Sequence, residues 1–245
     1  MKNLLKYSFV IGLGVFAFAC KKDNYATPDL TLSGHITYKG ETINVEKDQV
    51  PYLIYQYGFG KVGPIGSFSD PIANQSVTPS FAQDGSYSQV LSGGTYKIII
   101  PNGQGPFLWK QTPAGNPDTV TVDLSSSQAI DLEVTPYYMI ENAQIAASAG
   151  NVTASFKISK IITDANAKDI DRVSLYINKT QFVSGGSNIA ATDIAGSDIT
   201  DLNNVSMSVT IPSITPTQSY VFARVGLKIA GVEDMIFSPL VKIDL

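Results

Sequence analysis

Short runs in which apolar and polar residues alternate are the feature that most constrains the fold of this 245-residue chain. Leu30, Leu32 and Ile36, for example, alternate with polar side chains, and similar runs recur at short intervals to the end of the chain. Period-two alternation places apolar side chains on one face of a strand, and Gly, Pro, Asn and Asp between runs are typical of turns. The sequence therefore predicts an all-β protein, in which only residues 189–199 could hold one helical turn.

The candidate strands fall into two blocks, which we expect to be two tandem β-sandwiches. Thr135-Pro136 separates a first block at 30–136 from a second at 137–245. The second block has the strand count and spacing of an immunoglobulin-like or fibronectin-III-like sandwich. We expect strands at 30–37, 50–57, 88–91, 95–100, 120–124 and 130–134 in the first block, and at 143–149, 151–158, 173–178, 205–211, 220–229 and 236–243 in the second. Asp84-Gly85 predicts a tight turn before the third of these strands.

The N-terminal residues 1–19 have the pattern of a secretory signal, with a basic start, a short apolar run and small residues before a cleavage point. The only cysteine, Cys20, follows directly and is the expected site of lipid attachment, with residues 20–29 as a polar tether. Acyl chains would anchor the protein, because each buried methylene contributes about 0.8 kcal/mol. The alternative is an ordinary signal peptide with a chance cysteine. Without a second cysteine, disulfides cannot brace the fold.

Charge excludes one class of partner. Removal of residues 1–19 takes away Lys2 and Lys6 and no acid, so 17 basic residues become 15 against 21 acidic ones, a net charge of −6. Nucleic-acid binding needs clustered Lys and Arg side chains that neutralise phosphates. No such cluster is visible in the sequence, and nucleic acid is therefore not an expected partner. With 44% hydrophobic residues, the chain has enough apolar surface for a packed core.

Two motifs in the first block resemble those of a known sandwich. Gly85-Ser86-Tyr87 and Gly94-Thr95-Tyr96-Lys97-Ile98 are similar to the repeated Gly-x-Tyr pattern of carboxypeptidase-regulatory, or transthyretin-like, domains. With Leu32-Ser33-Gly34-His35-Ile36-Thr37-Tyr38 and Asp131-Leu132-Glu133-Val134-Thr135-Pro136-Tyr137, residues 30–245 resemble a Bacteroidetes-type lipoprotein family of unknown function, often found with starch-utilisation-type glycan-uptake systems. Cys20-Lys21-Lys22-Asp23 also resembles the surface-export signal of such lipoproteins. The resemblance implies a lipid-anchored protein on the outer face of the outer membrane, with transporters and binding lipoproteins as partners.

The residues offer little for catalysis, so we do not expect an enzyme. His35 is the only histidine, and the strand pattern places it opposite the apolar face, at the surface. Neither Gly-x-Ser-x-Gly nor a phosphate-binding loop occurs. The loop at 164–171 has oxygen ligands at odd spacing, but it lacks the glycine and the closing glutamate of a calcium loop. We therefore predict no catalytic residue, no metal and no cofactor. A hydrolase would need two carboxyl groups facing each other in a cleft.

Aromatic side chains are the better candidates for function, because glycans stack on flat rings beside polar groups. The candidate ligand-binding residues are the rings of Trp109, Phe107, Tyr57 and Phe59, together with Gln104 and Asn102 in the Gly/Pro-rich loop at 101–106. The alternative is that Phe107 and Trp109, two residues apart, form the buried face of a strand. Exposed rings would favour ligand binding, whereas buried rings would favour a structural role.

Asp118-Thr119-Val120 resembles the acceptor motif for O-glycosylation in the same bacteria, which makes Thr119 a candidate modification site. Taken together, these observations predict a non-catalytic accessory lipoprotein that binds glycan for an outer-membrane uptake system. The alternative is a structural or docking lipoprotein that binds partner proteins and no sugar.

Overall fold

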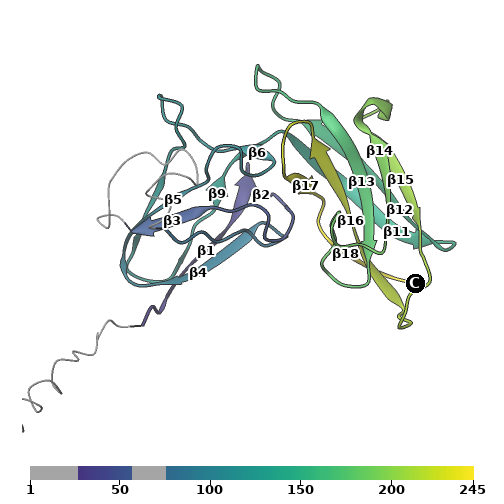
Figure 1. Cartoon of the computed structure of the whole chain (residues 1–245), viewed down its shortest axis with the longest axis horizontal. Helices are drawn as coiled ribbons and strands as arrows, with labels where there is room; N and C mark the ends of the chain where they lie inside the picture. Colours follow the sequence, from purple (N-terminus) through teal and green to yellow (C-terminus); the bar gives the residue numbers. More distant parts are fainter. Residues whose placement is uncertain (1–26, 57–75) are drawn as a thin grey trace, which may run out of the picture.

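The computed structural model describes residues 27–56 and 76–245. The signal at 1–19, Cys20, Tyr57 and Phe59 lie outside these residues. The described part is all-β and consists of two sandwiches that lie side by side (Figure 1), which confirms the predicted fold class. The described residues include no helix with the length and hydropathy of a membrane span.

The first sandwich has two main sheets. One pairs β1 with β2 and β4, and the short strands β8 and β9 run parallel to β1 on its other side; the second sheet has the order β3-β5-β7. A two-stranded ladder, β6 with β10, leads into the second sandwich. The strand bounds are β1 Leu30–Tyr38, β2 Glu41–Thr42, β3 Leu53–Gln56, β4 Ser86–Leu91, β5 Gly94–Ile99, β6 Phe107–Leu108, β7 Val120–Leu124, β8 Gln128–Ala129, β9 Leu132–Glu133 and β10 Thr135–Pro136.

Alternation explains the core of the first sandwich. In β1, Leu32 and Ile36 are fully buried while His35 between them is exposed. Three rings pack together beside these side chains: Tyr52 stacks on Phe81 at 4.5 Å between centroids, and Tyr87 contacts both edge-on. Aromatic pairs in such geometries add about 0.5–1.5 kcal/mol beyond the burial of their area.

The second sandwich has one sheet of order β11-β12-β15 and another of order β14-β13-β16-β17, in which β18 also pairs with β16. In an immunoglobulin constant-type sandwich the strand after the third pairs with the first sheet. Here that strand, β14, pairs with β13 instead, so the first sheet keeps three strands. The bounds are β11 Tyr138–Ser148, β12 Asn151–Lys160, β13 Ile170–Asn178, β14 Ala190–Ala195, β15 Val205–Thr210, β16 Tyr220–Ile229, β17 Met235–Phe237 and β18 Val241–Asp244.

The sequence predicted a helical turn within 189–199, and the structure places two elements there. Ala190–Ala195 is strand β14, and only the 3-10 helix Gly196–Asp198 is helical. β14 pairs along one edge with β13, and none of its side chains is fully buried. An edge strand of this kind lacks strong apolar alternation, because neither of its faces is completely covered.

β16 explains how the two sandwiches meet. Its odd-numbered residues, such as Val225 and Leu227, point into the core of the second sandwich, and its even-numbered residues lie on the opposite face. On that outer face Arg224 contacts Phe237 of β17, which lies on the side of the second sandwich nearest the first (Figure 1). The Phe237 N–H donates to the Asn44 carbonyl at 2.9 Å, so β17 is hydrogen-bonded directly to the first sandwich.

Candidate functional site

The structure corrects the expectation that Phe107 and Trp109 form a stacking platform. Both rings are buried, with 3% and 4% of their surface exposed. Phe107 packs against Gly105, where an added Cβ would lie 2.4 Å from the ring. The indole Nε1–H of Trp109 donates to the Asp118 carbonyl at 2.6 Å. A sugar ring cannot lie flat on either side chain, because protein atoms already cover both.

The polar candidates beside these rings do not converge on one cavity. Asn102 is exposed and its Oδ1 accepts a hydrogen bond from Gln111 Nε2 at 2.8 Å. Gln104 is half-buried. Trp109 lines a groove of about 540 Å³ that Leu108, Val134 and Ile161 also line. Trp109 contributes little surface there, and its only donor is already bonded.

The remaining predicted residues are dispersed. Tyr57 and Phe59 lie outside the described residues. Thr119 is half-buried, and its N–H is bonded to the Asp118 carboxylate at 2.8 Å. His35 is exposed, as the strand pattern predicted, with Nδ1 3.8 Å from Asp131. Within 27–56 and 76–245, no three His, Cys, Asp or Glu side chains are grouped so that they could hold a metal ion.

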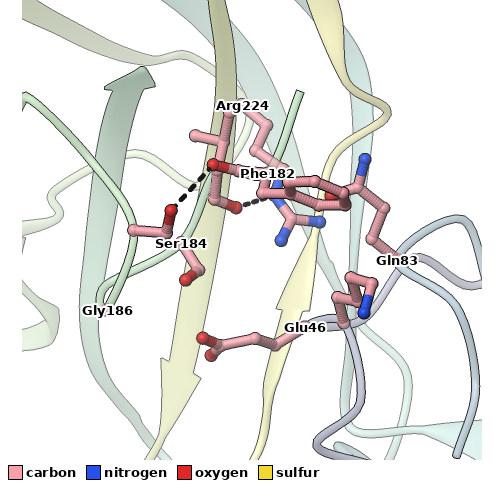
Figure 2. A pocket seen from close by; sticks show the side chains of 9 residues that line it. Glu46, Gln83, Phe182, Ser184, Gly186 and Arg224 are labelled. Carbon is pink, nitrogen blue, oxygen red and sulfur yellow. Dashed lines mark hydrogen bonds between the residues drawn. The ribbon is translucent and has the colours of Figure 1, made fainter. Parts of the chain in front are cut away.

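A different pocket lies where the two sandwiches meet, and we call it the interdomain pocket (Figure 2). It has a volume of about 300 Å³. The first sandwich contributes Glu46, Lys47 and Gln83, which lie in its connecting loops. The second sandwich contributes the rest of the lining, which comprises Phe182, Val183, Ser184, Gly186, Ser187 and Arg224.

The loop at 181–188 forms one wall of the interdomain pocket, and Asn178 at the end of β13 holds it in place. The Asn178 amide nitrogen donates to the carbonyl of Phe182 at 2.6 Å and to that of Ser187 at 3.2 Å. Ser184 and Ser187 also exchange two backbone hydrogen bonds. This bonding fixes the backbone, while the Phe182 ring stays 43% exposed, one of the few large apolar side chains at the described surface.

Arg224 supplies a buried cation to the interdomain pocket, although only 1% of its surface is exposed. Its Nε donates to the Val183 carbonyl, its Nη1 donates to the Val45 carbonyl at 3.0 Å, and its guanidinium lies 3.7 Å from the centre of the Phe237 ring. Burial lowers the pKa of Arg224 to about 10, an effect that nearby Glu46 opposes. The side chain is therefore charged at neutral pH.

Gln83 brings an unsatisfied acceptor to the same place. Its Nε2 donates to the Gln181 carbonyl at 3.0 Å across the two sandwiches, whereas its buried Oε1 has no hydrogen-bond partner. A buried polar atom without a partner costs about 1–3 kcal/mol. A bound ligand with a hydroxyl donor would remove this cost.

Asp234 provides a further polar link between the sandwiches, and it gives a testable prediction. Its buried Oδ2 accepts the Gly105 N–H at 2.8 Å, and burial raises the pKa of this carboxyl. Asp234→Ala should lower the free energy of unfolding by about 1–3 kcal/mol, because the Gly105 N–H would lose its acceptor. Asp234→Asn keeps an acceptor for the Gly105 N–H and removes the buried charge. Its free energy of unfolding, measured with urea, should therefore change by less than about 1 kcal/mol. Equal losses in both variants would contradict this explanation.

Sequence reasoning missed the interdomain pocket. One signal was present: Arg224 is one of only two arginines, and it interrupts the apolar strand β16. A charged residue inside such a run needs a buried partner or a function. Phe182 gave no comparable signal, because a single ring in a polar loop has no periodic pattern.

Comparisons with known proteins agree with the two-sandwich architecture. Residues 30–135 match the family model described as "Protein of unknown function (DUF3823) N-terminal domain", and residues 138–242 match "Domain of unknown function (DUF3823_C)". A search of curated proteins finds no match to this chain.

Solved structures give the same result. A DUF3823 family protein from Parabacteroides merdae is 30% identical with a TM-score of 0.72, and one from Bacteroides ovatus is 26% identical with a TM-score of 0.73. A candidate carbohydrate binding protein from Bacteroides uniformis, at 16% identity and a TM-score of 0.66, shares the fold. Each alignment covers 89% of this chain and 100% of the other. By its sequence and by its structure, the chain belongs to the DUF3823 family.

Proposed function

We propose that this protein is a non-catalytic glycan-binding lipoprotein, anchored through Cys20 to the outer face of the outer membrane, where it serves an uptake system as an accessory subunit. The signal-like residues 1–19 and the single cysteine after them support the anchor. The tether at 20–29 would then hold the two sandwiches away from the membrane.

The observation that carries the binding function is the exposed Phe182 ring at the rim of the interdomain pocket. An aromatic face can cover the apolar face of a sugar, and nearby polar groups can bind its hydroxyls. Gln83, Glu46 and Ser184 supply such groups beside the ring. The pocket volume of about 300 Å³ is at the lower end for small-molecule sites, which suits one end of a glycan. The Bacteroides uniformis structure with the same fold, a candidate carbohydrate binding protein, is consistent with this proposal.

Phe182→Ala tests the proposal. For any glycan that binds, the substitution should weaken the affinity about fivefold or more, because it removes roughly 1 kcal/mol of ring contact. The free energy of unfolding should change by less than about 0.5 kcal/mol, because the ring is exposed. Isothermal titration calorimetry against a glycan panel gives the affinity, and Val90→Ala, a substitution at another exposed apolar side chain, in β4, is the matched control.

The proposal fails if the unaltered protein binds no glycan of the panel, or if Phe182→Ala binds as well as the unaltered protein does. The first result would favour the second candidate function, a docking lipoprotein that binds partner proteins and no sugar. The burial of Phe107 and Trp109 is the observation that favours this candidate, since it removes the stacking platform that the sequence predicted.

A further inference from the structure

We infer that the interdomain pocket selects an acidic sugar, whose carboxylate pairs with Arg224. This inference rests on the proposed glycan-binding function and specifies the ligand class. It comes from three features that meet in the pocket, namely an unpaired buried cation, an orphaned acceptor and an exposed ring.

No carboxylate in the described part of the chain forms an ion pair with the Arg224 guanidinium. None of the ion pairs within 4.0 Å among the described residues includes Arg224. A guanidinium has five N–H donors in a planar fork, and the two hydrogen bonds to Val45 and Val183 use two of them. A buried charge is costly unless it is paired. A carboxylate in the pocket would supply the missing charge, and the geometry of a carboxylate matches the guanidinium fork.

The nearest protein carboxylate in the lining does not fill this role. Glu46 influences Arg224 electrostatically, yet the two side chains form no ion pair. Figure 2 shows the Glu46 carboxylate in a separate part of the pocket, away from the guanidinium. The ligand would therefore lie with its anionic group towards Arg224 and its hydroxyl groups towards Glu46, which is a strong hydrogen-bond acceptor.

Gln83 adds a second requirement. Its Nε2 is held by the Gln181 carbonyl, so the amide cannot flip without losing that hydrogen bond. The orphaned Oε1 therefore needs a donor from outside the protein, and a sugar hydroxyl is such a donor.

The charges of the lining are a separate consideration. Lys47 lies with its Nζ 5.6 Å from the centre of the Phe182 ring and is paired with Asp48. Since Asp48 pairs with Lys47, Arg224 is the lining cation for which no ion pair among the described residues is found, and an anionic group would fit beside it.

Together these features describe a ligand with an apolar ring face, several hydroxyl donors and one carboxylate. A hexuronic acid residue at the end of a glycan has all three. A neutral hexose could donate a hydrogen bond to Gln83 and stack on Phe182, but it would leave the charge of Arg224 unpaired. We therefore expect the pocket to discriminate between an acidic sugar and its neutral counterpart.

The test compares trigalacturonic acid with its fully methyl-esterified form, which keeps the same sugar rings and hydroxyl groups, adds a methyl group at each carboxyl and has no charge. Calorimetry on the mature chain should show at least tenfold weaker binding of the ester. Glu46→Gln should tighten binding of the acid by about twofold or more, because it removes a charge of the same sign as the ligand from the lining, while the amide oxygen can still accept a hydrogen bond from a sugar hydroxyl. Arg224→Lys should lose most of the preference for the acid over the ester, because an ammonium group cannot present the planar fork of a guanidinium to a carboxylate.

Trp109 fluorescence provides a control on where the acidic sugar binds. This residue lines a different groove, so binding in the interdomain pocket should leave the indole emission unchanged. An equal affinity for acid and ester, binding of only neutral or only sulfated glycans, or a shift of the indole emission by the acid would each overturn the inference and leave the glycan-binding proposal standing. If no acidic, neutral or sulfated glycan binds, both fail.

Discussion

Gly85→Ala should lower the free energy of unfolding by about 2–5 kcal/mol, which is more than the same substitution should cost at Gly103. Gly85 has φ +75°, where an L side chain costs about 1–2 kcal/mol. An added Cβ would also lie 2.1 Å from the Ile43 carbonyl oxygen, a backbone atom that cannot turn aside. Forcing an extra methyl group into a packed site costs about 1–3 kcal/mol more.

Gly103→Ala is the matched control. Gly103 has a similar φ of +83°, but no other part of the described chain lies within 4 Å of the position that an added methyl group would take. Only the backbone cost of about 1–2 kcal/mol applies there. Chemical denaturation of both variants therefore separates the two contributions. Equal losses at the two positions would show that the contact with Ile43 relaxes and that the explanation of Gly85 is wrong.

Cys20→Ser should move the protein entirely from the membrane fraction to the soluble fraction of cells. A single acyl chain gives only marginal membrane binding, whereas two or more hold a protein stably. All acyl chains of the proposed anchor would be attached through this one residue, so the substitution removes them together. Metabolic labelling with a clickable fatty acid measures whether lipid is attached, and fractionation of the labelled cells measures whether the protein stays with the membrane.

Thr27→Ser is the control for this experiment, because it changes an exposed residue in the tether and keeps the cysteine. It should be labelled and retained in membranes like the unaltered protein. A label that persists in Cys20→Ser, or an absence of label in the unaltered protein, would refute the lipid anchor. The glycan-binding experiments on the mature chain would remain valid in either case.

Local pattern was sufficient for most of the fold. β1 and β16 were predicted because their buried side chains alternate with less buried ones, and the Asp84-Gly85 turn was predicted because few residues adopt a positive φ. β14 was missed because it is an edge strand with one half-buried face and one exposed face. The candidate site was harder to predict. Phe107 and Trp109 alternate in the way that both buried strands and exposed binding strands can, so the pattern did not distinguish between the two.

The sequence by itself determined that the chain forms strands and turns and that these strands are grouped into two sandwiches, because side-chain periodicity and turn chemistry are local properties. Only the tertiary structure decided which polar groups meet. Arg224 and Val45 are 179 residues apart in the chain, and Gln83 and Gln181 are 98 residues apart. Such contacts arise from the packing of one sandwich against the other, which no local pattern encodes. The interdomain pocket is a consequence of that packing.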